Sequence, residues 1–190
     1  YDTLGNMLET EVIYFTYTSP IWDELQKIIY TWDSNGKWTE IIIYNYNSGT
    51  WEENFKVEQN HDIYGNLSME AYYYWSSGAW VGNYKYEYAY DANGKQTMEA
   101  YYYWSSGKWK GNYKYERVYD VNGNQIMYAS YNWNDSVWVG NYKYECAYDA
   151  NGYETLDAYY TWGDSVWVGY YKYEYGYDAN GVQIMKAYYD

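Results

Sequence analysis

The sequence is poor in the residues that build most reactive and cross-linked sites. Its 190 residues include a single cysteine, Cys146, and a single histidine, His61. One cysteine cannot form a disulfide framework or a cysteine metal cluster, and no Ser/His/Asp or Cys/His arrangement can be argued around one histidine in a tyrosine column. We therefore expect no enzyme activity, no catalytic residue, no metal site and no cofactor.

Basic residues are also scarce. The chain has 12 Lys and Arg against 26 Asp and Glu, which gives a formal net charge of −14. Such an acidic chain repels nucleic acid and anionic lipid, and no apolar run is long enough to span a membrane. We expect no nucleic-acid partner and no membrane insertion. No signal peptide is recognisable, and because the chain opens at Tyr1-Asp2 inside a turn motif, we expect it to be a piece of a longer protein.

Aromatic residues other than phenylalanine are abundant, and they are periodic. The chain holds 35 Tyr and 12 Trp but 2 Phe. Three independent columns recur every 29 residues: Trp22, Trp51, Trp80, Trp109, Trp138 and Trp167; Gly36, Gly65, Gly94, Gly123, Gly152 and Gly181; and Lys27, Lys56, Lys85, Lys114, Lys143 and Lys172. This period identifies a tandem repeat.

Each repeat carries two turn signals between strand-like, tyrosine-rich runs. The stretch 91–94, Asp-Ala-Asn-Gly, has the signature of a type I turn in which Asp caps the turn and Gly supplies a left-handed residue. The stretch 105–108, Ser-Ser-Gly-Lys, is predicted to be a four-residue loop between two tryptophans, and Pro20 falls in the corresponding loop of the first unit. Two turns per unit predict two antiparallel strands per unit.

The register follows if Trp75 faces Trp80 across the loop. Tyr73 then faces Gly82, so that an aromatic ring covers a strand glycine, while Ala71 faces Tyr84, Met69 faces Tyr86 and Glu70 faces Lys85. The Asp turn gives the matching pairs Tyr88 with Met98, Tyr86 with Ala100 and Tyr84 with Tyr102. This register places Met, Ala, Tyr, Trp and Gly on one face, predicted to be the more buried, and Glu, Val, Asn and Lys on the other.

The sequence thus predicts an all-β fold: tandem 29-residue β-hairpin repeats that form one long antiparallel meander, twisted or superhelical. A closed or a flat sheet stays open as an alternative. The whole chain, 1–190, is one array with units at about 1–31, 32–60, 61–89, 90–118, 119–147 and 148–176 and a partial unit at 177–190. The first two units are irregular, with Glu53 in place of the strand glycine, which indicates either a cap of the array or a neighbouring domain.

The second strand and its turn resemble a known family. Residues 86–95, Tyr-Glu-Tyr-Ala-Tyr-Asp-Ala-Asn-Gly-Lys, are similar to the core of YD repeats of the RHS type, and the Tyr-Asp-x-Asn-Gly motif returns at 119–123, 148–152 and 177–181. The resemblance implies a spiralling β-sheet shell on a secreted or cell-surface protein, although the period and the Trp pair differ from that family. The whole unit also looks like tandem repeats of bacterial surface proteins exported by the type IX system. Its likeness to choline- and glucan-binding repeats is weaker, because those are shorter.

The tryptophan pairs are the best candidates for a binding site. They could clamp the hairpin ends, or they could form an aromatic platform for sugar rings: Trp75 with Trp80, Trp104 with Trp109, Trp133 with Trp138, and Trp162 with Trp167. The outward tyrosines Tyr72, Tyr101 and Tyr159 are a further option. The repeated Asp turns could bind calcium weakly, but turn capping accounts for them better, and His61 and Cys146 are expected to be a column variant and a passive thiol.

We therefore expect a structural or adhesive repeat segment of an extracellular or cell-surface protein, which serves as spacer, shell or scaffold. The alternative is a carbohydrate-binding module that uses the Trp and Tyr ladders. Expected partners are polysaccharide, other surface proteins, or further copies of the chain that pair through the end strands.

Overall fold

The computed structural model describes residues 9–18 and 21–190. The predicted turn at Tyr1-Asp2, Pro20 and the side chain of Trp22 lie outside this described part. The remaining chain is all β, and each strand is antiparallel to the next, as predicted. The strands are β1 (Glu9–Thr18), β2 (Ile21–Trp32), β3 (Trp38–Asn47), β4 (Thr50–His61), β5 (Leu67–Ser76), β6 (Ala79–Tyr90), β7 (Gln96–Ser105), β8 (Lys108–Tyr119), β9 (Gln125–Asn134), β10 (Val137–Tyr148), β11 (Glu154–Gly163), β12 (Val166–Tyr177) and β13 (Gln183–Tyr189).

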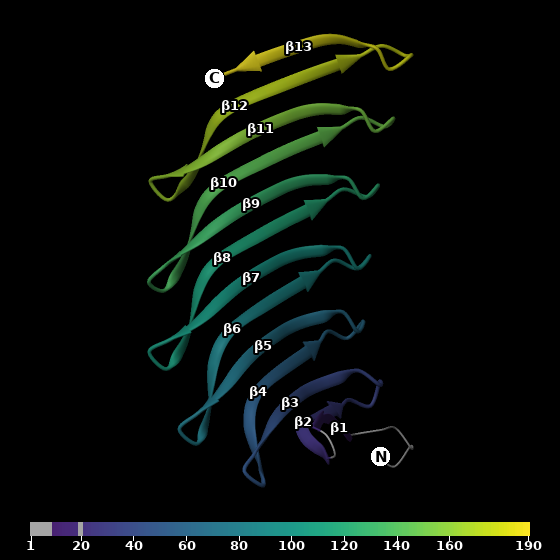
Figure 1. The fold of residues 1–190 in the computed structure, drawn as a ribbon. Helices are drawn as coiled ribbons and strands as arrows, with labels where there is room; N and C mark the ends of the chain where they lie inside the picture. Colours follow the sequence, from purple (N-terminus) through teal and green to yellow (C-terminus); the bar gives the residue numbers. More distant parts are fainter. Residues whose placement is uncertain (1–8, 19–20) are drawn as a thin grey trace. The chain divides into compact units, whose positions relative to one another are not determined.

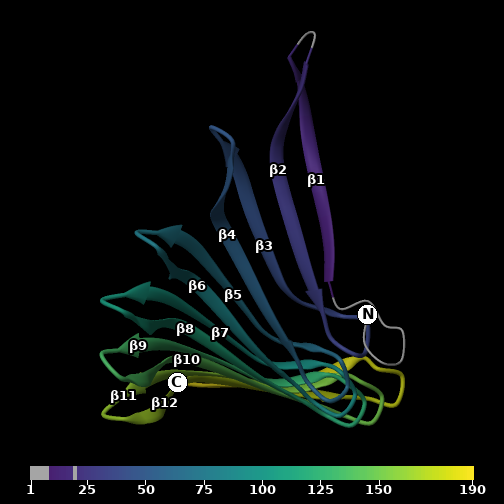
Figure 2. The ribbon, with the colours of Figure 1, turned by 90° about the horizontal axis from the view of Figure 1, so that it is seen from below.

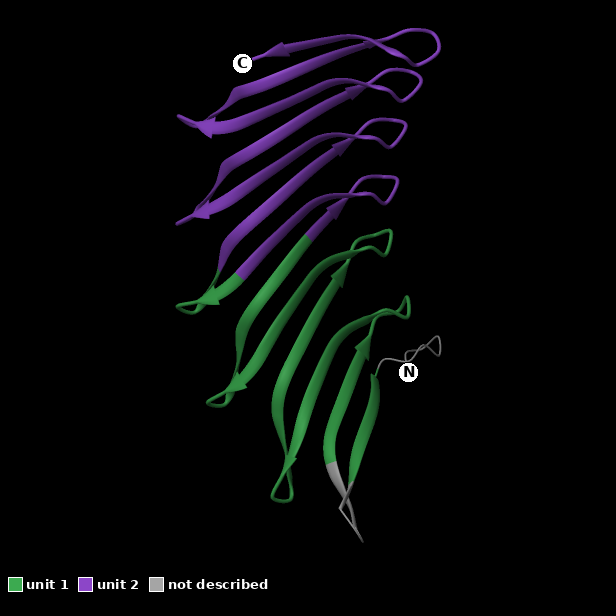
Figure 3. Ribbon diagram, turned by 45° about the horizontal axis from the view of Figure 1, so that its top comes forward, with its two compact units in different colours: residues 1–87, 103–109 green, residues 88–102, 110–190 purple. Residues whose placement is uncertain are grey.

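The strands form one sheet whose order is the order of the chain, which confirms the predicted meander with two strands per repeat. The chain divides into two compact units: residues 1–87 with 103–109, and residues 88–102 with 110–190 (Figure 3). In the second unit β9 to β13 follow one another side by side, with the Asp turns at one edge and the tryptophan hairpins at the other (Figure 1). In the first unit β1 to β6 follow one another in the same way (Figure 2).

The Asp turns have the predicted structure. The N–H of Asp120 donates to the carbonyl of Asn124 at 2.9 Å, and the N–H of Gly123 donates to the carbonyl of Asp120 at 3.0 Å. The Asp120 carboxylate accepts the N–H groups of Asn122 and Asn124 at 2.9 and 2.8 Å. Gly123 has a φ of 86°, a left-handed conformation that glycine adopts without strain. The aspartate therefore caps the turn, and the glycine closes it.

The tryptophan hairpins are tighter than predicted. Strand β7 ends at Ser105 and β8 begins at Lys108, so the loop has two residues rather than four. Ser106 and Gly107 have φ angles of 54° and 76°. Positive φ at both positions is the type I′ geometry, whose twist matches that of the flanking strands.

A β-bulge in each second strand corrects the predicted register. Trp75 lies opposite Trp80, and Tyr73 lies opposite Gly82, as predicted. The next pair is Tyr72 with Tyr84, so Asn83 is an extra residue and Lys85 lies opposite Ala71. The predicted pairs of Ala71 with Tyr84, Met69 with Tyr86 and Glu70 with Lys85 are therefore wrong. A bulge places two residues against one and moves every later side chain to the other face.

A second irregularity lies at each Asp turn. In the corresponding pair of strands, Tyr148 lies opposite Glu154 and Ala147 opposite Leu156, so Thr155 is extra. Glu145 consequently lies opposite Ala158, whereas the predicted register had placed a tyrosine opposite that alanine. Each predicted register omitted one bulge residue, so both were wrong by one residue and still assigned the same residues to the same face.

The corrected register defines two faces, named here by their most frequent aromatic residue. The tryptophan face carries the columns of Ala71, Tyr73, Trp75, Trp80, Gly82, Lys85 and Glu87. The tyrosine face carries the columns of Glu70, Tyr72, Tyr74, Val81, Tyr84, Tyr86 and Tyr88. The lysines and glutamates of the second strand thus lie among the tryptophans, whereas the prediction had put them on the opposite face.

Burial is concentrated in small side chains. Ala71, Ala100, Ala129 and Ala158, one from each of four first strands, are at most 2% exposed. No larger side chain in the described residues is fully buried, and the tryptophans are half-buried. The sheet is a single layer in each unit, so its large side chains shield the alanines between them rather than packing against a second layer. The described residues contain no helix that could span a membrane.

Candidate functional site

The predicted tryptophan pairs meet edge to face. The two rings of each pair are 4.8–5.0 Å apart between centroids and inclined by 70–80°: Trp75 and Trp80, Trp104 and Trp109, Trp133 and Trp138, Trp162 and Trp167. This is a favourable aromatic geometry. Because the two rings are nearly perpendicular, a pair does not form the flat platform that the sugar-binding alternative assumed.

In three of the four pairs, the first tryptophan covers a glycine of the preceding repeat: Trp104 covers Gly82, Trp133 covers Gly111 and Trp162 covers Gly140. A Cβ atom added to Gly111 would lie 2.6 Å from the ring of Trp133, and one added to Gly140 would lie 2.3 Å from Trp162. The glycine is therefore required by the close approach of the indole ring. The sequence correctly predicted an aromatic cover for this glycine but assigned it to the tyrosine of the same hairpin, whereas the covering ring comes from the next repeat.

The second tryptophan of each pair also contacts the preceding repeat. Trp138 meets Tyr102 edge to face at 5.9 Å, and Trp167 meets Tyr131 in the same way at 5.9 Å. Both members of a pair are thus engaged in joining one repeat to the next. These contacts between repeats come in addition to the edge-to-face contact of the two tryptophans within each hairpin.

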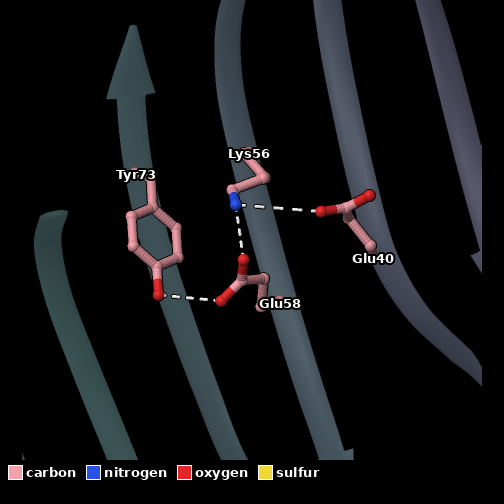
Figure 4. A network of polar contacts seen from close by, with 4 residues as sticks. All are labelled: Glu40, Lys56, Glu58 and Tyr73. Carbon is pink, nitrogen blue, oxygen red and sulfur yellow. Dashed lines mark hydrogen bonds and ion pairs between the residues drawn. The ribbon is translucent and has the colours of Figure 1, made fainter. Parts of the chain in front are cut away.

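A lysine, a glutamate and a tyrosine form a second link between repeats (Figure 4). Lys56 pairs with Glu58 two residues further along β4 and with Glu40 of β3 at 3.7 Å. The hydroxyl of Tyr73 on β5 donates to Glu58 at 2.8 Å, and the Lys56 amine lies 4.6 Å from the centroid of the Tyr73 ring. One carboxylate therefore holds a cation of its own strand and a hydroxyl of the next.

The same link recurs in the second unit with nearly constant distances. Tyrosine hydroxyls donate to glutamates over 2.8–2.9 Å: Tyr131 to Glu116, Tyr160 to Glu145, and Tyr189 to Glu174. The paired lysines lie 2.6–2.8 Å from those glutamates: Lys114, Lys143 and Lys172. As at Ala71 and Lys85, the lysine of the last link lies opposite an alanine: Lys172 is opposite Ala158, and Asp157 is opposite Tyr173.

The electrostatics of this link favour a charged carboxylate and a neutral phenol. Desolvation by burial, and then the hydrogen bond to Glu116, raise the pKa of Tyr131 far above its ordinary value. Desolvation also raises the pKa of Glu116, but the hydrogen bonds from Lys114 and Tyr131 outweigh it and leave that pKa below its ordinary value. The groups are therefore held in the protonation states that maximise their mutual hydrogen bonds.

The tyrosine face carries a connected row of rings. In the second unit, neighbouring centroids are 5.0–6.3 Å apart from β7 to β13, through Tyr101, Tyr113, Tyr115, Tyr128, Tyr142, Tyr159, Tyr171, Tyr173 and Tyr188. Several rings along this face are exposed, with 38% for Tyr144 and 56% for Tyr188. Tyr101 and Tyr159, predicted to point outward, are half-buried and stack on Tyr113 and Tyr171.

The remaining candidates have structural surroundings. Each Asp-turn carboxylate accepts backbone hydrogen bonds of its own turn, and the described residues contain no cluster of three or more His, Cys, Asp or Glu that could hold a metal ion. Burial, and then Glu154, raise the pKa of the Cys146 thiol to about 11, so the thiol is protonated at neutral pH.

Sequence reasoning missed two features. It divided the tyrosines between the faces incorrectly, because no residue pattern had been assigned to the bulge at Asn83 and its equivalents. It also missed a cavity beside His61. The available signal for the cavity was the exchange of tyrosine for the smaller histidine in a column that is otherwise aromatic and large.

Comparison with known proteins gives no family. No family model matches the chain, and no curated protein does. Among solved structures, the chain is similar to a protein of unknown function from Bacteroides fragilis, with 17% identity over 70% of this chain and 89% of that one and a TM-score of 0.39. It is also similar to a DUF3836 family protein from Bacteroides vulgatus, with 18% identity over 57% of this chain and 99% of that one and a TM-score of 0.36.

Proposed function

We propose that this chain is a structural repeat segment, a scaffold or spacer, of a secreted or cell-surface protein. The observation that carries the proposal is the recurring Lys–Glu–Tyr link, for example Lys143, Glu145 and Tyr160, which ties the second strands β4, β8, β10 and β12 to the strand that follows each of them. In repeat proteins, stability is the sum of the intrinsic stability of each repeat and of its contacts with neighbours. A face whose charged and aromatic groups are occupied by such contacts suits a structural role.

Insertion of one further repeat tests the proposal. A copy of residues 119–147 is inserted between Ala147 and Tyr148, which extends the array without a break in its 29-residue period. We expect the free energy of unfolding in urea to rise, because the added repeat gains one full interface with its neighbour. The control is the same insertion with Trp133→Ala and Trp138→Ala in the inserted copy only, which lacks the aromatic part of that interface.

The two inserted proteins are to be compared by circular dichroism and tryptophan fluorescence. A modular scaffold predicts a single transition at higher urea for the regular insertion and a lower midpoint, or a second transition, for the control. If the regular insertion lowers the midpoint below that of the original chain, the repeats are not interchangeable and the scaffold proposal fails.

Carbohydrate binding is a second candidate, and exposed rings support the tyrosine face, rather than the tryptophan pairs, as its site. The tryptophan rings are engaged in contacts between repeats, whereas the tyrosine face offers exposed rings, among them Tyr144 and Tyr188. Tyrosine rings pack on the C–H faces of sugars while their hydroxyls form hydrogen bonds. Sugar binding to this face is separated from binding in the His61 cavity by the variant described below.

A further inference from the structure

The space between the turns at Asp91 and Asp120 is filled by side chains. The amine of Lys95, from one turn, donates to the carbonyl of Gly123 in the next turn. The same amine lies 4.7 Å from the centroid of the Tyr119 ring, and the Tyr119 hydroxyl donates to the carbonyl of Gln96 at 3.3 Å. A long cation and a tyrosine ring therefore close the gap between these turns.

The equivalent place in the first unit is open. His61 stands in the column of Tyr119, and Lys37 stands in the column of Lys95. A Cβ atom on Gly65 would lie 3.0 Å from the Cε atom of Lys37, so the lysine still reaches toward the next turn. The Lys37 amine, however, has no ion pair or hydrogen bond within the described part of the chain, and the shorter imidazole ring does not fill the space of a phenol.

A cavity of about 700 Å³ occupies this break in the repeat. Its lining comes from the turns at Asp33 and Asp62 and from the adjoining ends of the strands: Asp33, Asn35, Lys37, Thr39, Gln59, Asn60, His61, Asp62, Ile63, Tyr64, Gly65 and Ser68. The volume lies in the range of small-molecule sites. The Nδ1 atom of His61 is buried and has no partner among the described residues, which marks an incompletely satisfied polar site.

The charges and the hydrogen-bonding groups of the lining residues indicate which class of ligand the cavity can bind. Two carboxylates, Asp33 and Asp62, face one lysine, so an anion is disfavoured. A metal ion is disfavoured because no cluster of three or more candidate ligands exists in the described residues. The many amide and hydroxyl groups, with a 74% exposed Tyr64 at the rim, suit a ligand that offers several hydroxyl groups and an apolar ring face.

We propose that this cavity is a binding site for a neutral sugar ring. The site is independent of the scaffold role, because it arises where the repeat departs from its pattern rather than where it follows it. At the Asp91 and Asp120 turns a lysine and a tyrosine close the gap, whereas His61 in place of the tyrosine leaves a space for a ligand between the turns at Asp33 and Asp62.

The test uses the complete chain with defined sugars. Saturation-transfer difference NMR is recorded with D-glucose, D-galactose, D-mannose and N-acetyl-D-glucosamine, and with the charged sugars N-acetylneuraminic acid and D-glucosamine. His61 is the only histidine, so its imidazole proton signals report on the cavity without ambiguity. We expect at least one neutral sugar to show saturation transfer and to shift the His61 signals with a dissociation constant on the order of 1 mM or lower.

Two variants locate the binding. His61→Tyr restores the residue of the regular repeats and fills the cavity, and we expect it to weaken binding of the neutral sugar by about tenfold or more while the near-ultraviolet circular dichroism stays native. Lys37→Asn introduces the residue that the next turn carries at that position, Asn66, and removes the amine. It serves as a second measure of site specificity and is expected to weaken binding as well.

Three outcomes overturn the proposal. If no neutral sugar binds at about 10 mM, the cavity is not a sugar site of the strength expected here. Binding of the charged sugars alone overturns the assigned ligand class. Equal binding by the original chain and by His61→Tyr places the sugar elsewhere, and the tyrosine face then becomes the site to examine.

Discussion

In the first strand of each repeat, the two faces of the sheet differ in how strictly their columns of side chains recur. On the tryptophan face the column of Trp75 continues unchanged as Trp104, Trp133 and Trp162. On the tyrosine face the column of Tyr72 continues as Tyr101, Ser130, Tyr159 and Tyr188, and that of Tyr74 continues as Tyr103, Asn132 and Thr161. The constant columns contain the rings that cover glycines and meet tyrosines of the preceding repeat. Among first-strand columns, the constant ones are thus those whose side chains fit a neighbouring repeat; in the second strands, the columns of Tyr84 and Tyr86 on the tyrosine face are constant as well.

The largest difference between the faces is expected on removal of a single ring. Trp133→Ala takes away the ring that covers Gly111 and the edge contact with Trp138, and we expect a loss of about 3 kcal/mol in the free energy of unfolding. Tyr144→Ala removes a 38% exposed ring of the opposite face and is expected to cost about 1 kcal/mol. Urea unfolding of both variants provides the measurement, and equal losses would show that the faces do not differ in this way.

A smaller change in the free energy of unfolding is expected when two glycines of one column, Gly111 and Gly169, are each replaced by alanine. The two replacements should differ in their effect. Gly111→Ala places a methyl group 2.6 Å from Trp133, and the forced displacement of the ring should cost about 2 kcal/mol. At Gly169 the nearest atom, on Tyr160, is 4.0 Å away, so Gly169→Ala should be neutral or should stabilise the strand by about 0.5 kcal/mol.

These two glycine variants test whether the indole cover, rather than the strand position, requires glycine. Thermal unfolding monitored at several wavelengths gives both values under one set of conditions. Destabilisation by Gly169→Ala as large as that by Gly111→Ala would contradict the assignment, because the two sites share a column and differ in the ring that covers them.

Local signals accounted for what the sequence predicted correctly. Aspartate followed by glycine three residues later determines the Asp turn, and the repeat period determines that every unit has the same two strands. The opposition of Trp75 and Trp80 was also predictable, because the loop between them is short and fixes the start of the register. The fold class and the Trp pairs of the candidate site were therefore accessible from residue spacing.

The distribution of side chains between faces was not accessible in the same way. It depends on the bulge at Asn83, and nothing in the alternation of Tyr, Lys and Glu distinguishes a continuous strand from one with an extra residue. The link between Lys85 and Glu87 is visible in the sequence as an i, i+2 pair, but its tyrosine partners lie on the next strand and depend on the register of both strands. The cavity at His61 depends in turn on how two turns face each other, which spacing alone does not determine.

The smallest effect on stability is expected from Glu145, a carboxylate of the tryptophan face, and it depends on pH. Desolvation raises the pKa of Glu145, but the hydrogen bonds from Lys143 and Tyr160 outweigh it, and the pKa in the folded chain lies below the ordinary value of 4.5. The unfolded chain then binds protons first as the pH falls, so the stabilisation is complete above about pH 4.5 and is lost as the pH falls through the folded value.

Glu145→Gln tests this contribution. The variant lacks the charged carboxylate at every pH, because an amide does not bind a proton in this range. We expect the variant to be less stable at neutral pH by about 0.5 to 1 kcal/mol, at the low end because the carboxylate is about one-third exposed. Urea midpoints measured from about pH 7 to about pH 3 should converge for the two proteins, whereas parallel curves would mean that Glu145 does not link the repeats through its charge.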